Sequence, residues 1–211
     1  MYARPTSSLL LLRHGETEWN VLGRLQGSDD SPLTARGLEQ AAALAAWTAS
    51  RGVRRVVCSP LGRARTTAEQ IAAACSAPLA VRDALAEMSF GECAGLTLGQ
   101  CEERFPAMLE ARARARWEHR WPGGESYADV LERTRRWLDS EPDALAGEVV
   151  AVVSHQALNR ALLVALTGCE LDWALSGAQA PGQAIEVLPD GRSRWIEFAA
   201  SPPATHAHGV I

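Results

Sequence analysis

Lysine is missing from this chain, so all 21 of its lysine-plus-arginine positions are arginines. A P-loop kinase or ATPase needs the lysine of its phosphate-binding motif, and Schiff-base catalysis needs a side-chain amine. Neither kind of active site can be built from this sequence.

Paired cysteines and long apolar runs are also missing. The five cysteines are an odd number and form no CxxC pair, which favours free thiols in a reducing cytoplasm over disulfides or a zinc site. No apolar run is long enough to span a bilayer, and no signal peptide opens the chain. We therefore expect a cytoplasmic protein with no membrane partner.

Charge and length point to an ordinary globular protein. A net charge of −4 with 47% hydrophobic residues gives no reason to expect nucleic acid as a partner. The 211 residues fit one α/β domain, which we place at 1–201. We expect a frayed tail at 202–211, because His206 and His208 lack the nearby carboxylate or cysteine that a metal pair would need.

Strand and helix patterns alternate along the chain. Apolar strand patterns lie at 7–13, 54–58, 79–82 and 148–154. Helical patterns lie at 34–51, 60–76, 97–118 with a break at Pro106, 126–140 and 158–166. Two last strands, at 183–188 and 194–198, flank a PDGRS turn and predict a hairpin. This order predicts an α/β fold: a mostly parallel, doubly wound sheet with helices on both faces and the hairpin at an edge.

Basic side chains follow three of the predicted strands. Arg13 and His14 end the first, Arg63 lies in the first turns of the helix after the second, and His155 follows the strand at 148–154. In an open parallel sheet these ends meet at one crevice. Cations buried there without an anion would cost several kcal/mol, and the arginine fork matches phosphate oxygens. The pattern predicts a phosphate site, with Gly15 letting the backbone approach the ligand closely.

Histidine in such a site predicts catalysis as well as binding. Its neutral imidazole can attack phosphorus to form a phosphohistidine, while a nearby carboxylic acid protonates the leaving alcohol. A cysteine-based phosphatase loop does not fit, because Arg63 follows Cys58 after four residues and Arg65 after six, where five are required. An aspartate-based mechanism needs a DxD motif that 13–20 lacks.

A set of motifs carries a resemblance to a known family. In chain order they are LLRHGETEWN, GRLQGSDDSPLTARGLEQA, CSPLGRARTTAEQ, LAEMSFGECAGLT, PGGES and VVSHQALNRALL. Together they resemble the histidine phosphatase superfamily, in its phosphoglycerate-mutase-like branch. The resemblance covers about 9–166.

The resemblance implies a role for each matching residue. His14 would be the nucleophile, and Glu87 would donate the proton to the leaving group, with Glu92 as a less well-spaced alternative. The phosphoryl group would be held by Arg13, Arg63 and His155. Further contacts to phosphate or substrate are implied at Asn20, Gln26, Ser28 and Gln156. A phosphatase of this kind uses no metal and no cofactor.

The segment 88–121 bears on which reaction the resemblance implies. Mutases of the family carry a longer insert here, with a tyrosine, a lysine and adjacent arginines, none of which this segment contains. We therefore expect a phosphomonoester hydrolase acting on a small phosphorylated metabolite. The alternatives are a cofactor-dependent phosphoglycerate mutase and a catalytically silent phosphate-binding protein. We interpret 88–121 as a helical, lid-like segment. Its arginine run 111–120 favours a solvated helix face, and the alternative is an electropositive lid over the crevice, in which Arg112 and Arg116 would meet a second anionic group. The oligomeric state stays open, with a homodimer among the alternatives.

Overall fold

The computed structural model describes residues 7–196 of the chain. The predicted tail, with His206 and His208, lies outside the described residues. Within 7–196, no helix combines the length and the apolar character needed to cross a membrane.

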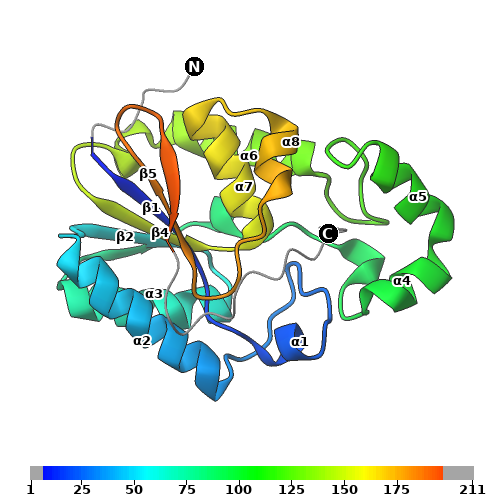
Figure 1. Ribbon diagram of the computed structural model, residues 1–211, viewed down its shortest axis with the longest axis horizontal. Helices are drawn as coiled ribbons and strands as arrows, with labels where there is room; N and C mark the ends of the chain where they lie inside the picture. The colour runs from blue at the N-terminus through cyan, green and yellow to red at the C-terminus, as the bar shows by residue number, and fades with distance from the viewer. Residues whose placement is uncertain (1–6, 197–211) are drawn as a thin grey trace.

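A single six-stranded sheet forms the centre of the fold (Figure 1). Its strands are β1 (Leu9–Arg13), β2 (Arg55–Cys58), β3 (Leu79–Val81), β4 (Val150–Ser154), β5 (Ala184–Val187) and β6 (Ser193–Ile196). The order across the sheet is β3-β2-β4-β1-β5-β6. The first four strands are mutually parallel, whereas β5 runs antiparallel to β1 and pairs with β6 at the edge. The predicted α/β sheet with an edge hairpin is confirmed.

Helices follow the predicted order, with two short additions. They are α1 (Glu18–Val21), α2 (Ala35–Ser50), α3 (Gly62–Cys75), α4 (Leu98–Arg104), α5 (Pro106–Arg114), α6 (Tyr127–Ser140), α7 (Gln156–Thr167) and α8 (Leu171–Ser176). Short 3₁₀ turns lie at Asp83–Leu85, Gly91–Cys93 and Pro142–Leu145. Thr34 caps α2 as predicted, because its side chain accepts a hydrogen bond from the backbone N–H of Gly37.

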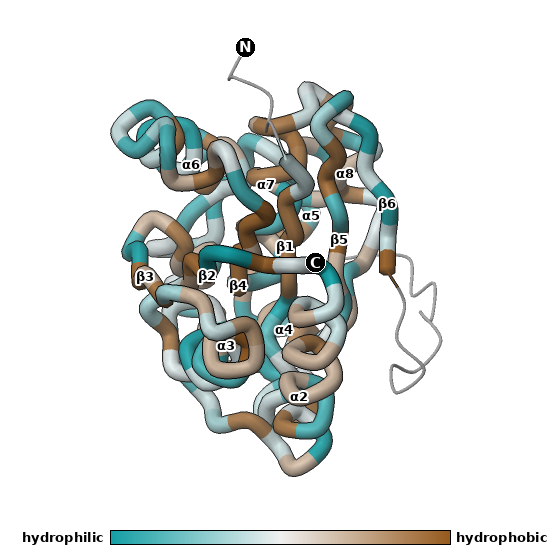
Figure 2. Tube along the Cα trace, turned by 90° about the vertical axis from the view of Figure 1, so that its left-hand side faces the viewer, coloured by the Kyte–Doolittle hydropathy of each residue, from teal (hydrophilic) through white to brown (hydrophobic). Residues whose placement is uncertain are grey.

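Two hydrophobic cores lie on opposite faces of the sheet, as the alternation of side chains along β1 requires. Leu9 and Leu11 belong to the core beneath α6 and α7, and Leu10 and Leu12 belong to the core beneath α2 and α3. All four leucines are at most 1% exposed. Figure 2 shows the apolar strands, in brown, between these two helix layers. A strand buried on both faces explains the unbroken leucine run.

The arginine run 111–120 departs from the prediction of a solvated face. Arg112 is 5% exposed, its guanidinium lies 4.3 Å from the centre of the Trp121 ring, and it donates to the carbonyl of His119. Only part of the run behaves as expected: Arg114 is exposed and pairs with Glu110. The chain folds back after α5, so a planar guanidinium stacks on an indole instead of facing water.

Candidate active site

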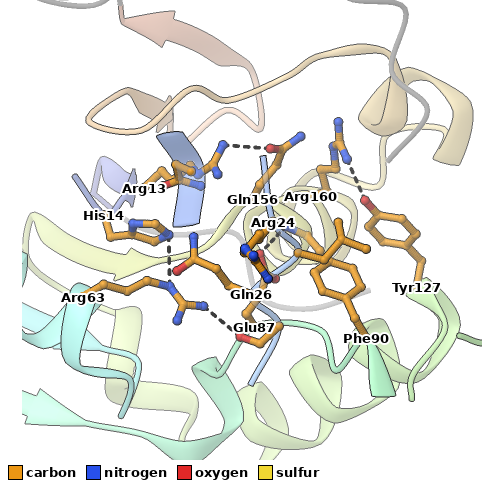
Figure 3. A pocket seen from close by; sticks show the side chains of 14 residues that line it. Arg13, His14, Arg24, Gln26, Arg63, Glu87, Phe90, Tyr127, Gln156 and Arg160 are labelled. Atoms are coloured by element: carbon orange, nitrogen blue, oxygen red, sulfur yellow. Dashed lines mark hydrogen bonds between the residues drawn. The ribbon is translucent and has the colours of Figure 1, made fainter. Parts of the chain in front are cut away.

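The ends of β1, β2 and β4 bring the predicted basic residues together. Arg13 ends β1, and His14 follows it. β2 leads into α3, which carries Arg63 in its first turn, and His155 is the N-cap of α7 directly after β4. The rings of His14 and His155 have centroids 5.2 Å apart. The Nε of Arg63 lies 3.3 Å from the Nε2 of His14 (Figure 3).

A pocket opens over this centre, with about 540 Å³ of empty space when its open mouth is included. That size is in the range of small-molecule sites. Its lining residues are Arg13, His14, Asn20, Arg24, Leu25, Gln26, Gly27, Arg63, Glu87, Phe90, Tyr127, Gln156, Ala157 and Arg160. Two residues implied by the resemblance do not line the pocket: Ser28 is exposed, and His155 is fully buried beside His14.

The hydrogen bonds of His14 define its proton arrangement. Its Nδ1 lies 2.7 Å from the carbonyl oxygen of Gly15, which can only accept, so Nδ1 carries the proton. Its Nε2 faces the Nε–H of Arg63, which can only donate, so Nε2 holds a lone pair. The imidazole is therefore neutral, and the nitrogen on the side of Arg63 is the one able to attack an electrophile.

Burial and charge keep both histidines neutral. The pKa of His14 lies well below its usual value because the ring is buried and because Arg63 and Arg13 repel a second positive charge. Burial, then Arg63 and His14, lower the pKa of His155 in the same way. Its Nε2 lies 2.7 Å from the hydroxyl oxygen of Ser59.

Arg63 is held by acceptors on the loop that precedes α2. Its two terminal nitrogens donate to the carbonyls of Asp29 (2.6 Å) and Gly27 (2.8 Å), and one also reaches Asp30 Oδ1 at 3.1 Å. Asp30 also accepts from the backbone N–H groups of Gly62 and Arg63, at the start of α3. Burial lowers the pKa of Arg63, and the carboxylates of Glu87 and Asp30 oppose that effect.

Arg13 is held from the other side. It donates to Gln156 Oε1 at 2.8 Å and to the carbonyl of Gln179 at 2.5 Å. Burial lowers its pKa to about 10, so it remains a cation at neutral pH. Its buried Nε has no hydrogen-bond partner within the described residues. A donor left free beside His14 suits an incoming anion.

Glu87 lies across the pocket from Arg13 and is 9% exposed. Its Oε1 accepts from the N–H of Met88 at 2.9 Å, and its Oε2 accepts from the N–H of Ala157 at 3.4 Å, in the first turn of α7. The alternative carboxylate, Glu92, is exposed and does not line the pocket.

Comparison with known proteins identifies the family. The family model of the histidine phosphatase superfamily, branch 1, matches residues 9–198. The chain belongs to this superfamily. The curated relatives of this histidine phosphatase include a protein of Salmonella paratyphi B named "Probable phosphoglycerate mutase GpmB". It is 31% identical over 88% of this chain and 86% of its own length.

Solved structures give the same fold with phosphatase names. A mycobacterial glucosyl-3-phosphoglycerate phosphatase in complex with VO3 superposes with a TM-score of 0.76 and 30% identity, covering 93% of this chain and 100% of its own. The α-ribazole phosphatase from Shigella flexneri superposes with a TM-score of 0.73 and 29% identity, covering 85% of this chain and 89% of its own.

Asn20 and Gln26 form part of the pocket floor of this histidine phosphatase. Both reach Thr17: Gln26 Nε2 donates to its hydroxyl at 2.8 Å, and Asn20 Oδ1 accepts from its backbone N–H at 3.1 Å. The Oε1 of Gln26 is buried without a partner among the described residues. It is an acceptor available to a substrate hydroxyl.

The outer wall of the pocket contains residues that the sequence analysis missed. Phe90 meets Trp121 edge to face at 5.0 Å, and Tyr127 stacks on Trp117 at 5.2 Å. Arg160 donates to the hydroxyl of Tyr127 at 2.6 Å, and Arg24 also lines this wall. Tyr127 directly follows PGGES, so that motif was the available signal.

Gly15 packs closely against the start of α2. A Cβ at this position would lie 2.2 Å from the carbonyl oxygen of Gly37, near the start of α2. The absence of a side chain therefore lets the loop after His14 pack against α2. Within the described residues, no group of three or more His, Cys, Asp or Glu side chains is placed to hold a metal ion.

Proposed function

We propose that this protein is a metal-independent phosphomonoesterase that hydrolyses a small phosphorylated metabolite through a phosphohistidine at His14. The observation that carries the proposal is the lone pair on His14 Nε2, held beside Arg63 in a pocket that also contains Arg13 and Glu87. We extend this to a cytoplasmic enzyme that uses no cofactor and recognises neither nucleic acid nor membrane.

In the first step, Nε2 of His14 attacks phosphorus and the phosphorus–oxygen ester bond breaks. Glu87, protonated at that moment, transfers its proton to the departing oxygen, and the alcohol leaves neutral. Arg13 and Arg63 stabilise the charge on the phosphoryl oxygens. His155 does not line the pocket and packs against His14, with ring centroids 5.2 Å apart. The products are the alcohol, phosphohistidine and a Glu87 carboxylate.

In the second step, water attacks phosphorus and the phosphorus–nitrogen bond breaks. The Glu87 carboxylate now accepts a proton from the attacking water, which restores its acid form. Inorganic phosphate leaves, and His14 regains its neutral imidazole. The same carboxyl group thus acts as acid and then as base.

Hydrolysis is favoured over phosphoryl transfer between positions of one substrate. The solved relatives named above are phosphatases, and 88–121 lacks the lysine, tyrosine and adjacent arginines of the mutase insert. The mutase remains the second candidate, because a curated relative at 31% identity carries that name. Conversion of 3-phosphoglycerate to its 2-isomer, against release of inorganic phosphate, separates the two.

The direct test is a rapid-quench experiment with ³²P-labelled substrate. The wild-type protein should yield a labelled species that is acid-labile and base-stable, as a phosphohistidine is. His14→Ala should yield none and should lose turnover of p-nitrophenyl phosphate. His119→Ala, outside the pocket, is the matched control. A silent phosphate-binding protein would show no turnover in the wild type, and retention of more than a few per cent of activity in His14→Ala would exclude the proposed nucleophile.

A further inference from the structure

The segment that carries Glu87 has little regular structure of its own. It runs between the 3₁₀ turns Asp83–Leu85 and Gly91–Cys93, and no strand or α-helix includes it. Leu85 and Met88 anchor it in the core, at 0% and 1% exposure. A proton donor must stay within hydrogen-bond reach of the leaving oxygen, so other contacts have to fix the path of this backbone.

Arg133, on α6, supplies two of those contacts. It donates to the carbonyl of Ala84 at 2.5 Å and to the carbonyl of Ala86 at 2.7 Å. Both carbonyls lie within three residues before Glu87 in the chain. A single guanidinium with its planar fork therefore fixes the backbone that enters the Glu87 position.

Glu125, in the PGGES motif, fixes the backbone on the other side. Its Oε2 accepts from the N–H of Ser89 at 2.9 Å, and its own N–H donates to the carbonyl of Ser89 at 2.9 Å. Glu125 also pairs with Arg133 through Oε1 and Nε at 2.9 Å. The two side chains thus form one clamp that spans Glu87.

Glycines bring the motif close enough for this clamp to form. A Cβ on Gly124 would lie 2.4 Å from the carbonyl oxygen of Ser89, and a Cβ on Gly91 would lie 2.0 Å from that of Pro122. The two backbones also pair, with the N–H of Glu92 donating to the carbonyl of Pro122 at 2.9 Å. The glycines of PGGES and FGE are therefore needed for backbone contact between the two segments.

We propose that Arg133 and Glu125 are positioning residues for the proton donor Glu87. They do not line the pocket, so they act on the reaction through the placement of its carboxyl group. Their role rests on the proposed function, because it requires Glu87 to be the acid. Displacement of a catalytic group by about 1 Å can cost about 10²-fold in rate, which sets the size of the expected effect.

The experiment compares two leaving groups. An alkyl phosphate such as glycerol phosphate needs a proton on its leaving oxygen, whereas p-nitrophenyl phosphate needs little help. Arg133→Met and Glu125→Gln should lower kcat for the alkyl ester by about 10- to 100-fold. They should change kcat for the aryl ester by less than about threefold, and leave inhibition by inorganic phosphate unchanged.

Matched controls lie on the same helix. Arg136 and Glu132 form an exposed i,i+4 pair on α6, so Arg136→Met and Glu132→Gln make the same chemical changes away from the clamp. They should leave both substrates near wild-type rates. The side chains of Arg133 and Glu125 are 19% and 25% exposed. Glu125→Gln keeps an oxygen that can accept from the Ser89 N–H, so Glu125→Gln should fold even if Arg133→Met does not. Thermal unfolding reports which variants are native at the assay temperature.

Double variants separate this inference from the proposed function. With Glu87→Gln already present, adding Glu125→Gln or Arg133→Met should cause less than about a twofold further loss on the alkyl ester, since the acid is gone. Equal losses on both esters from the clamp variants, or a full further loss in the Glu87→Gln background, would overturn the positioning role. Glu87→Gln alone tests the acid: if it affects both esters equally, the assignment of the acid fails, and the clamp inference fails with it.

Discussion

Replacing Asp30 by alanine should weaken both the start of α3 and the hold on Arg63. The carboxylate accepts from the backbone N–H groups of Gly62 and Arg63, where Leu61 provides no side-chain cap of its own. It also forms an ion pair with the Arg63 guanidinium at 3.1 Å. One side chain therefore fixes the end of the helix and Arg63, which the helix carries.

The expected magnitude follows from these contacts. Loss of an N-cap costs about 1 kcal/mol. The ion pair adds at most about 1 kcal/mol, because the Asp30 side chain is 41% exposed and water screens it. A total of about 1–2 kcal/mol corresponds to a fall in Tm of about 2–8 °C for a chain of this size. Arg63 keeps its two carbonyl acceptors, so the loss in kcat/KM should be about tenfold, well below the roughly 10²–10³-fold cost of removing a main oxyanion donor.

The assay combines thermal unfolding with kinetics on p-nitrophenyl phosphate. Asp30→Asn keeps an oxygen for the cap but no charge, so it should recover most of the Tm and only part of the rate. Asp29→Ala removes the neighbouring charge and keeps the backbone carbonyl that Arg63 uses, and it should stay close to wild type. Equal kinetics in Asp30→Ala and Asp29→Ala would refute the reasoning, because the contacts that only Asp30 makes with Arg63 and α3 would then have no effect on the rate.

Four further predictions concern the loop after His14, the pH profile of the reaction, the pH dependence of stability, and metal. Gly15→Ala would place its new Cβ 2.2 Å from the carbonyl oxygen of Gly37, so it should lower the free energy of unfolding by about 1–3 kcal/mol and lower kcat. Gly99→Ala adds a Cβ in open space on α4 and should change neither quantity. Thermal unfolding and initial rates check both variants. The pKa of His14 lies below its ordinary value of about 6.5, so the midpoint of the acidic limb of kcat/KM should lie below pH 6.5. Arg63→Met removes a nearby positive charge and should move this midpoint to higher pH. A wild-type midpoint above pH 6.5 would contradict the prediction. The unfolded chain binds protons at His14 and His155 that the native state does not, so the free energy of unfolding should fall as pH drops below about 6.5. Phosphate release should survive excess EDTA, and loss of activity that a divalent ion restores would exclude a metal-independent enzyme.

The cluster of basic residues could be placed from sequence because strands determine it. Arg13, Arg63 and His155 each follow a short apolar run, and parallel strands deliver their carboxyl ends to one edge. The positions of these residues could be predicted from the order of the elements along the chain and from the rule for parallel sheets. The same reasoning could not show that His155 would be fully buried beside His14.

The outer wall could not be predicted because loops and side-chain packing determine it. Phe90 lies outside strands and α-helices, where hydrophobic periodicity carries no signal. Tyr127 and Arg160 lie on predicted helices, but their place in the wall depends on side-chain contacts that periodicity does not show. The four-residue helix α1 was missed since its capping box uses Asn20 where glutamate or glutamine is usual. Arg112 was misjudged because its burial depends on an indole that returns to it only after the chain turns.

The residues proposed to bind and react with phosphate lie on four segments that the unfolded chain keeps far apart: Arg13 with His14, then Arg63, Glu87 and His155. An unfolded chain therefore has no phosphate site, and an anion that binds the pocket binds the native state alone. Inorganic phosphate at about 100 times its Kd should raise the free energy of unfolding by about 2.7 kcal/mol. The cellular concentration of inorganic phosphate would then set how long this enzyme survives proteolysis, as well as how strongly phosphate inhibits the enzyme as its product.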